Sequence, residues 1–391
     1  SFLGVSKDGS DTKVVTHQLE PLTEVDPNLI SKEVIRDIHD GVTTVELDVH
    51  SAKIAQSLCT YHPQYGKLAG RIYMSNYHKN NIYDLAKNEF NTSVPTGKQR
   101  RAIEETLFLK TAHALWNNTD KSGKQAPLLA PHVYRIIEEN AKKFEELLDY
   151  TKDFRFDFLG MTMMERKYLL SANMNNGKKM RRVSIERPQH MIMRVAIGLH
   201  CSGEYHPYTS DKETNFSIFE DALKELDVDL SREDRLKVLA RLLPYLKFPD
   251  NNTRVDWGEY NLSQHTGQIT EEQWDNIKST YNTISQGQAT HATPTLFNAG
   301  TLRPQCSSCF LVMLPADSLE GIARFFTILM HIQKGAGGLG CNIHNIRASG
   351  SYIRGTNGTS NGITPFAKVV NAISIYIDQG GNKRPGSNAL Y

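Results

Sequence analysis

The stretch His291-Ala-Thr-Pro-Thr-Leu-Phe-Asn-Ala-Gly300 begins the part of the sequence that decides the fold. Further pieces of the same kind follow it: Cys306-Ser-Ser-Cys309, Lys334-Gly-Ala-Gly-Gly-Leu-Gly340, Gly355-Thr-Asn-Gly358 and Asp378-Gln-Gly-Gly-Asn-Lys-Arg-Pro-Gly386. Each is a turn punctuated by Gly, Asn or Pro beside a short apolar run, so backbone N–H donors can approach a ligand where side chains would block it. This pattern predicts a nucleotide-binding layout.

The composition indicates a globular chain. Of its 391 residues 39% are hydrophobic and 23% charged, enough to bury the core of one large or two smaller domains. The 45 Lys and Arg against 43 Asp and Glu leave no basic excess for duplex nucleic acid. No apolar run approaches the roughly 20 residues that cross a bilayer, and residues 1–7 show no signal-peptide pattern. We therefore expect a cytoplasmic protein that binds neither nucleic acid nor membrane.

The cysteines favour a reducing compartment, because five of them are too few and too scattered for a disulfide framework. Cys306 and Cys309 have the C-x-x-C spacing of redox and metal sites. A zinc site would need a second C-x-x-C or an H-x-x-x-H at a suitable distance, and the sequence has neither. We expect no metal in this chain.

The N-terminal part predicts helices. Residues 26–76 show apolar residues at helical spacing, a stop at Gly41 and a capping box of Thr43 with Glu46, which indicate three helices. On this pattern alone they are a helical bundle with nothing bound. Residues 98–150 predict two long amphipathic helices.

The middle of the chain predicts a hairpin, a helix and an insertion. The basic run 176–182 reads as a solvated hairpin tip, and Pro188 opens a helix at its first turn. Residues 201–268 are polar and read as a surface insertion of unknown purpose, with short helices around 219–226 and 232–246.

After a capped helix at Thr270, strands and helices alternate. The predicted elements are strand 310–314, helix 317–332, strand 339–343 and helix 369–377. This alternation predicts parallel βαβ units.

Several long motifs, in this order along the chain, are similar to the large subunit of class I ribonucleotide reductase of the eukaryotic and large-virus type. They are Gly41-Val-Thr-Thr-Val-Glu-Leu-Asp48, Glu186-Arg-Pro-Gln-His-Met191, Thr293-Pro-Thr-Leu-Phe-Asn-Ala-Gly-Thr301, Ser307-Ser-Cys-Phe-Leu311, Arg347-Ala-Ser-Gly-Ser-Tyr-Ile353 and Asp378-Gln-Gly-Gly-Asn-Lys-Arg-Pro-Gly386. The resemblance implies an α/β protein in which an N-terminal helical domain precedes the first half of a ten-stranded α/β barrel. The domains expected are 1–90, a degenerate ATP-cone; 91–200, helical; 201–268, the surface insertion; and 269–391, the half-barrel.

The reaction implied is reduction of ribonucleoside diphosphates to deoxyribonucleoside diphosphates by thiyl-radical chemistry. Cys309 matches one of the two thiols that form a disulfide in the family's reaction. The alternative for a lone cysteine is a small, buried hydrophobic residue without a chemical role. Cys306 is not a family cysteine and receives no role. The positions that match substrate contacts are Thr293, Ser308, Gly338, Gln379 and Arg384.

Two effector sites are implied as well. The specificity site, for ATP or a deoxynucleoside triphosphate, corresponds to Asp317, Ser318, Leu319, Lys334, Arg347, Arg354 and Gly355. Asp317 is expected to open a helix whose N-terminus favours anions, and the arginines to pair with phosphates. The activity site of the ATP-cone corresponds to Lys7, Thr44, Asp48 and Lys79.

The implied partners are a di-iron small subunit that supplies the radical, thioredoxin or glutaredoxin as reductant, and a second large subunit in a homodimer. The sequence ends at Tyr391, before the family's radical cysteine, so we expect the chain to be inactive alone. It is a truncated chain, a fragment, or half of a split enzyme that needs a second half-chain. Two alternatives stay open: a non-catalytic nucleotide-binding module that dimerises with a full-length large subunit, and an adenosylcobalamin-dependent enzyme of the same superfamily.

Overall fold

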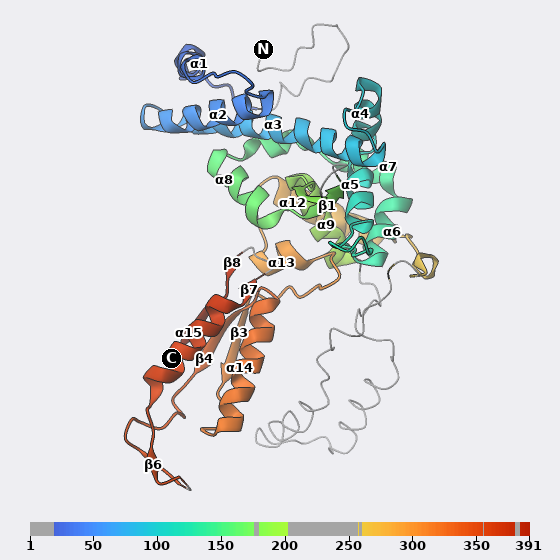
Figure 1. Cartoon of the computed structure of the whole chain (residues 1–391). Helices are drawn as coiled ribbons and strands as arrows, with labels where there is room; N and C mark the ends of the chain where they lie inside the picture. Colours follow the sequence, from blue (N-terminus) through green and yellow to red (C-terminus); the bar gives the residue numbers. More distant parts are fainter. Residues whose placement is uncertain (1–18, 176–179, 202–256, 258–259, 355, 380–383) are drawn as a thin grey trace. The chain divides into compact units, whose positions relative to one another are not determined.

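The computed structural model describes residues 19–175, 180–201, 257, 260–354, 356–379 and 384–391 (Figure 1). The chain divides into two compact units, one formed by Ser1–Ser202 with His265–Tyr391 and the other by Gly203–Gln264. The second unit lies largely outside the described residues, and so do the short helices predicted at 219–226 and 232–246.

The three helices predicted for residues 26–76 are confirmed. They are α1 (Pro27–Arg36), α2 (Thr44–Ser57) and α3 (Gln64–Glu89). The capping box is reciprocal: Glu46 N donates to Thr43 Oγ1 at 3.2 Å, and Thr43 N donates to Glu46 Oε2 at 2.8 Å. Buried Ala52, Ala55 and Ala69 allow α2 and α3 to pack closely.

The prediction of two long helices in residues 98–150 is wrong. The structure has four short helices there: α4 (Gly97–Glu104), α5 (Leu107–Trp116), α6 (Pro131–Glu139) and α7 (Ala141–Leu147). Between α4 and α5 the chain breaks so that Glu145 Oε1 can accept from Phe108 N at 2.5 Å, which caps α5. Asn140 separates α6 from α7, and its side chain donates to the carbonyls of Ile136 and Gly267.

The helical part continues with a hairpin, a π-helical turn and four further α-helices. The elements are α8 (Phe158–Met163), a π-helical turn η4 (Met164–Tyr168), strands β1 (Ser171–Asn175) and β2 (Met180–Ser184), and helices α9 (Pro188–His200), α12 (Glu271–Ser285) and α13 (Thr293–Asn298). The two strands pair antiparallel, as the predicted hairpin requires, and its tip lies outside the described residues. Helix α9 begins at Pro188 as predicted and is buried along nearly its whole length.

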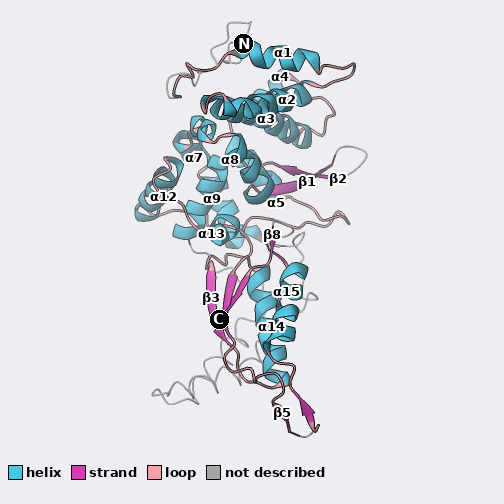
Figure 2. Ribbon diagram, turned by 90° about the vertical axis from the view of Figure 1, so that its left-hand side faces the viewer, coloured by secondary structure: helices cyan, strands magenta, loops and turns pink. Residues whose placement is uncertain are grey.

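The C-terminal part forms parallel βαβ units, which confirms the predicted alternation. Its elements are β3 (Cys309–Met313), α14 (Leu319–Lys334), β4 (Gly338–Asn342), α15 (Ile363–Tyr376) and β9 (Asn388–Leu390). The strands form a parallel sheet in the order β3-β4-β9, and α14 and α15 lie on one side of it (Figure 2). Phe325 and Leu329 of α14 pack with Leu339 of β4 and Phe366 of α15 in the core between these layers.

Two short antiparallel strand pairs also belong to this part: β5 (Tyr352–Ile353) with β6 (Gly358–Thr359), and β7 (Asp378–Gln379) with β8 (Arg384–Pro385). Across the described residues, no helix combines the length and the apolar character that a membrane span requires.

Candidate functional site

A buried ion pair fixes the start of the candidate substrate segment. Arg194 Nε donates to Glu186 Oε1 at 2.6 Å, and both side chains are 1% exposed. The same guanidinium donates to the carbonyls of Ala299, at 2.6 Å, and Leu296, at 3.1 Å. The buried Arg194 guanidinium of α9 therefore fixes the last turn of α13 through these two hydrogen bonds.

The segment after α13 is held by side-chain amides. Asn298 Nδ2 donates to the carbonyls of Gln305, at 2.7 Å, and Gly335, at 3.1 Å. Gln305 Nε2 also donates to the Gly335 carbonyl, at 3.1 Å, and Thr295 Oγ1 donates to the carbonyl of Cys306. These bonds set the path by which the chain enters β3.

Cys309, Ser308 and Gly338 are brought together by the sheet. Cys309 is opposite Gly338 in the parallel register of β3 and β4, and Gly338 N donates to the Ser308 carbonyl at 2.7 Å. The Cys309 thiol is exposed. Next to it, a Cβ on Gly337 would lie 2.6 Å from the Phe310 ring, so this glycine is required for packing rather than for a turn alone.

Thr293 contacts a residue that the sequence did not suggest. Its Oγ1 lies 3.2 Å from the Tyr168 hydroxyl, and the Tyr168 ring packs edge-on against Phe297 at 5.0 Å between centroids. Tyr168 ends the π-helical turn η4, a local irregularity that often marks a functional region. The signal available in the sequence was Tyr168-Leu-Leu170, an aromatic residue beside an apolar pair.

The specificity-site candidates meet in part at the beginning of α14. The helix starts at Leu319 with Ser318 as its N-cap, so Asp317 does not open it as expected. Instead Asp317 Oδ2 accepts from Arg347 Nε at 2.5 Å and from Arg347 N at 3.2 Å. The Asp317 carboxylate is thus hydrogen-bonded to Arg347, while the Ser318 hydroxyl caps α14 by accepting from Gly321 N.

The remaining specificity-site candidates lie farther along. Lys334 is the last residue of α14, and Arg354 is exposed just after β5. Gly355 lies outside the described residues. Gln379 and Arg384 are backbone partners in the β7–β8 hairpin.

The activity-site candidates are partly assembled. Lys79 Nζ of α3 forms an ion pair with Asp48 Oδ2 of α2 at 3.1 Å, and Thr44 is the first residue of α2. Lys7 lies outside the described residues.

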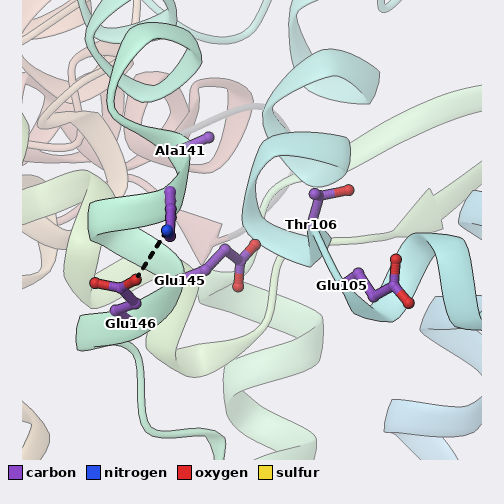
Figure 3. Close-up of a pocket in the computed structure, with 6 residues that line it drawn as sticks. Glu105, Thr106, Ala141, Glu145 and Glu146 are labelled. Atoms are coloured by element: carbon purple, nitrogen blue, oxygen red, sulfur yellow. Dashed lines mark ion pairs between the residues drawn. The ribbon is translucent and has the colours of Figure 1, made fainter.

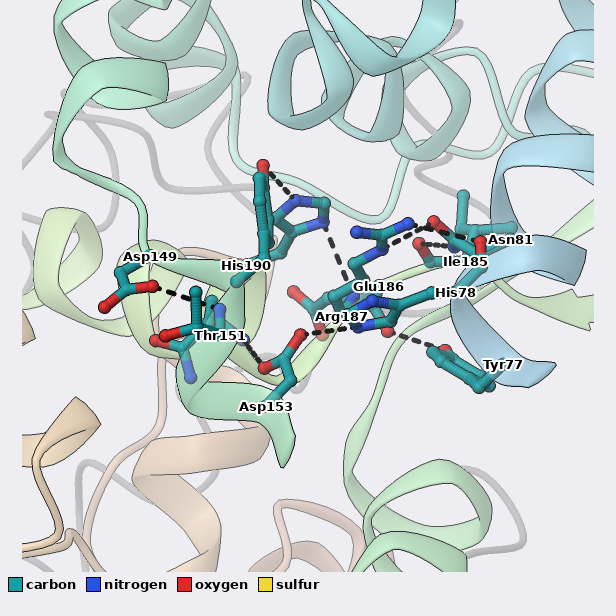
Figure 4. Close-up of polar contacts among 12 residues, drawn as sticks. Tyr77, His78, Asn81, Asp149, Thr151, Asp153, Ile185, Glu186, Arg187 and His190 are labelled. Carbon is teal, nitrogen blue, oxygen red and sulfur yellow. Dashed lines mark hydrogen bonds and ion pairs between the residues drawn. The ribbon is translucent and has the colours of Figure 1, made fainter. Parts of the chain in front are cut away.

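Sequence reasoning missed a buried polar cluster beneath α3 and α9 (Figure 4). Arg187 Nε donates to Asn81 Oδ1 at 3.1 Å, and His78 Nε2 lies 2.9 Å from Asp153 Oδ2. Burial, reinforced by the Arg187 charge, lowers the pKa of His78 to about 4, against the raising effect of its hydrogen bond to Asp153. The signal available was Glu186-Arg-Pro-Gln-His190, a polar run at the start of an apolar helix.

A pocket of about 490 Å³ lies between α4, α5 and α7 (Figure 3). Glu145 on its wall accepts from Phe108 N and from the Tyr150 hydroxyl, and burial raises the pKa of this carboxyl. These contacts give Glu145 a capping role, and none of the predicted site residues lines the pocket. Among the described residues, no group of three or more His, Cys, Asp or Glu is arranged to hold a metal ion.

Comparison with known proteins finds sequence similarity to ribonucleotide reductase large subunits along nearly the whole chain. The ribonucleotide reductase all-alpha domain matches residues 154–304, and the ribonucleotide reductase barrel domain matches residues 307–391. The ribonucleoside-diphosphate reductase large subunit of Arabidopsis thaliana is 34% identical over 99% of this chain and 36% of its own length. The large chain of Schizosaccharomyces pombe is 38% identical over 94% of this chain and 33% of its own.

The large subunit of vaccinia virus is 35% identical over 94% of this chain and 35% of its own. The chain thus spans about a third of the length of these relatives. Its helical part precedes the beginning of an α/β barrel domain, in the order of the two matched domains. The chain belongs to the ribonucleotide reductase large-subunit family.

Proposed function

We propose that this chain is the part of a ribonucleoside-diphosphate reductase large subunit that carries one redox cysteine and the nucleotide effector sites. The exposed Cys309 thiol on β3, opposite Gly338 on β4, carries the proposal. A strand neighbour without a side chain leaves the space beside the thiol open to a sugar ring. The relatives' printed names supply the reaction class.

In the proposed reaction Cys309 is one of two thiols that give up two electrons and two protons and end as a disulfide. The 2′-hydroxyl leaves the ribose as water, and the product is the deoxyribonucleoside diphosphate. The Thr293 and Ser308 hydroxyls hydrogen-bond the substrate, and Gln379 and Arg384 read its base. We assign the second thiol to no residue of residues 1–391. A small di-iron subunit supplies the radical, and thioredoxin or glutaredoxin reduces the disulfide.

The effector site that we propose surrounds the beginning of α14. Ser318 and the exposed Leu319 lie beside the Asp317–Arg347 ion pair, which presents a positive guanidinium at 37% exposure. A triphosphate gains charge-assisted hydrogen bonds from Arg347 and Arg354. Thr44, Asp48 and Lys79 belong to the proposed ATP-cone, residues 1–90, where Lys79 Nζ lies 3.1 Å from Asp48 Oδ2, and we propose them as the ATP or dATP contacts of that domain. The domain limits 91–200, 201–268 and 269–391 are also proposals, and they rest on the order of the motifs that resemble the family.

Binding of dTTP to this chain tests the effector site directly. Arg347→Ala is expected to weaken dTTP binding by about tenfold or more, because a charge-assisted hydrogen bond to phosphate is lost. Isothermal titration calorimetry gives the dissociation constant, and Arg303→Ala, the same change at an exposed arginine outside the set, is the control. Equal affinity in wild type and Arg347→Ala would remove Arg347 from the site. Tight dTTP binding without turnover after reconstitution would favour the regulatory module over the enzyme.

A further inference from the structure

Tyr168 contacts two residues on the same face of α13. Its hydroxyl lies 3.2 Å from Thr293 Oγ1, and its ring packs edge-on against the Phe297 ring, with 5.0 Å between the centroids and 61° between the planes. Thr293 and Phe297 are four positions apart, so they are neighbours on the helix surface. The contact with Phe297 fixes the Tyr168 ring, and the fixed ring determines where its hydroxyl lies.

The two ends of α13 are held by different elements. Arg194 of α9 donates to two carbonyls at the end of the helix, whereas Tyr168 of η4 contacts Thr293, the first residue of the helix. Residues 294–297 are buried, and Thr293 is partly exposed. The Thr293 hydroxyl can therefore reach a ligand, while the four residues that follow it stay in the core.

The π-helical turn η4 places Tyr168 for this contact. The wide turn is closed by Leu169 N, which donates to the Met164 carbonyl, five positions earlier, at 3.0 Å. In an α-helix, residues three positions apart lie on the same face, so Glu165 and Tyr168 would point in similar directions. In η4 the Glu165 carboxylate accepts from the Tyr73 hydroxyl of α3 at 2.5 Å, while Tyr168 contacts α13. The π turn thus lets one short segment contact both α3 and α13.

The hydrogen bond between Tyr168 and Thr293 has a preferred direction. A phenol is a stronger acid than an aliphatic alcohol, so the Tyr168 O–H is the better donor and the Thr293 oxygen the better acceptor. When Thr293 accepts from Tyr168, its own hydrogen is available for another acceptor. A hydroxyl that accepts one hydrogen bond also donates a second one more strongly, because the bonds of a chain polarise one another. The pair thus prepares Thr293 to donate to an oxygen of a ligand.

We propose that Tyr168 is a positioning residue for substrate binding, which orients and polarises the Thr293 hydroxyl so that it donates to an oxygen of the ribonucleoside diphosphate. The inference rests on the proposed function, which gives Thr293 a contact with the substrate and gives Tyr168 no role. Tyr168 acts through Thr293. Loss of its hydroxyl therefore weakens substrate binding and leaves the redox chemistry of Cys309 intact.

Steady-state kinetics of the full-length large subunit, assembled with its radical-generating subunit, test this role. Tyr168→Phe removes the hydroxyl and keeps the ring against Phe297. It is expected to raise KM for CDP about tenfold at a fixed ATP concentration, with kcat changed by less than about twofold. Tyr83→Phe, which removes a hydroxyl that donates to the Ser93 carbonyl, is the matched control and should keep the KM of wild type. A purely structural role would lower kcat with KM unchanged, and that result would overturn the proposal.

A double-mutant cycle separates the role of Tyr168 from the proposed function. Thr293→Ala alone is expected to raise KM for CDP about tenfold. Once Thr293 is Ala, adding Tyr168→Phe is expected to change KM by less than about twofold, because no hydroxyl is left to orient. If Tyr168→Phe has the same effect with and without the Thr293 hydroxyl, the proposal is wrong and the substrate contact of Thr293 stands. An unchanged KM in Thr293→Ala would refute both.

A spectroscopic measurement tests the orientation of Thr293 without turnover. In the chain with carbon-13-labelled threonine methyl groups, three-bond couplings of the Thr293 methyl carbon report its χ1 rotamer. Wild type and Tyr83→Phe are expected to show one rotamer, and Tyr168→Phe an average over two, because threonine populates two rotamers in helices. A single Thr293 rotamer in Tyr168→Phe would overturn the proposal. Absence of turnover in the assembled wild type would contradict the proposed function instead, and this spectrum would still decide whether Tyr168 orients Thr293.

Discussion

Cys309 of β3 differs from Cys341 of β4 in its surroundings. Its thiol is exposed at the start of β3, whereas Cys341 of β4 is buried among Leu314, Phe325 and Leu339. Burial raises the pKa of Cys341 to about 11 and also raises that of Cys306. A thiol must be reachable to exchange with a second thiol, so accessibility separates Cys309 from the buried Cys341.

Cys309→Ser is expected to abolish multiple turnover in the reconstituted enzyme while leaving dTTP affinity unchanged, because a hydroxyl cannot form a disulfide. Turnover is measured with a single ribonucleoside diphosphate and an external reductant. Cys306→Ser, in the segment just before β3, is the matched control and should keep its activity. Continued multiple turnover of Cys309→Ser would exclude it as a redox thiol.

At the scale of residues, the sequence allowed site residues to be predicted only where they lie in a motif. Cys309 and Thr293 could be named because they lie in long motifs whose order resembles a family. The Asp317–Arg347 ion pair spans 30 positions and the His78–Asp153 contact spans 75, and periodicity carries no information about such distant partners. The resemblance to a family therefore identified candidate site residues, whereas the contacts of these residues could be found only in the structure.

At the scale of elements, the junction of α9 with α13 positions the substrate segment. Gly198 of α9 lies so close to Gly300 that an added Cβ would be 2.2 Å from the Gly300 nitrogen. Gly300 has a φ of 75°, which favours glycine, and its carbonyl accepts from Ala130 N. Two glycines facing each other let the backbones approach without side chains between them.

Gly198→Ala is therefore expected to lower the free energy of unfolding by roughly 2 kcal/mol or more, because backbone rather than a flexible side chain must move. Urea unfolding followed by circular dichroism measures it. Gly97→Ala, at the first residue of α4 with nothing within 4 Å of its added Cβ, is the control and should be neutral or slightly stabilising. Equal stability of the two variants would show that the close approach is dispensable.

Element prediction succeeded where local signals were complete. The capping box at Thr43 and the proline at 188 determine helix starts from neighbouring residues alone. Residues 98–150 were mispredicted because α5 receives its cap from Glu145, which is distant in sequence. Because the capping residue is 37 positions away in the sequence, the residues around the break between α4 and α5 do not indicate it.

For the whole molecule, the cluster around His78 links stability to pH. The folded protein holds His78 neutral, with its pKa lowered to about 4 from an ordinary value of 6.5, first by burial and then by Arg187. The unfolded chain takes up a proton below about pH 6.5 and the folded chain only near pH 4, so stability is full above pH 6.5 and falls as pH drops toward 4. Burial also lowers the pKa of His190, so His190 contributes to the same loss of stability at low pH.

Between pH 7 and pH 4.5, wild type is expected to lose about 2 kcal/mol more unfolding free energy than His78→Gln, which keeps a polar side chain but cannot titrate. Urea midpoints at several pH values give the difference. His50→Gln, at a histidine with 38% side-chain exposure, is the control and should follow wild type. Parallel curves for wild type and His78→Gln would contradict the buried-neutral assignment.

The Arg194 guanidinium also has a consequence for the order in which the chain is made. Arg194 and the Ala299 carbonyl that it binds are 105 positions apart, so at about 5–20 residues per second the ribosome needs roughly 5 to 20 s to supply the acceptor. Until then Arg194 has Glu186 as its partner but lacks the Ala299 and Leu296 carbonyls, so two of the hydrogen bonds that its burial requires are missing. We expect stalled nascent chains ending near residue 260 to be cut by protease within residues 188–200, and chains extended beyond residue 340 to resist.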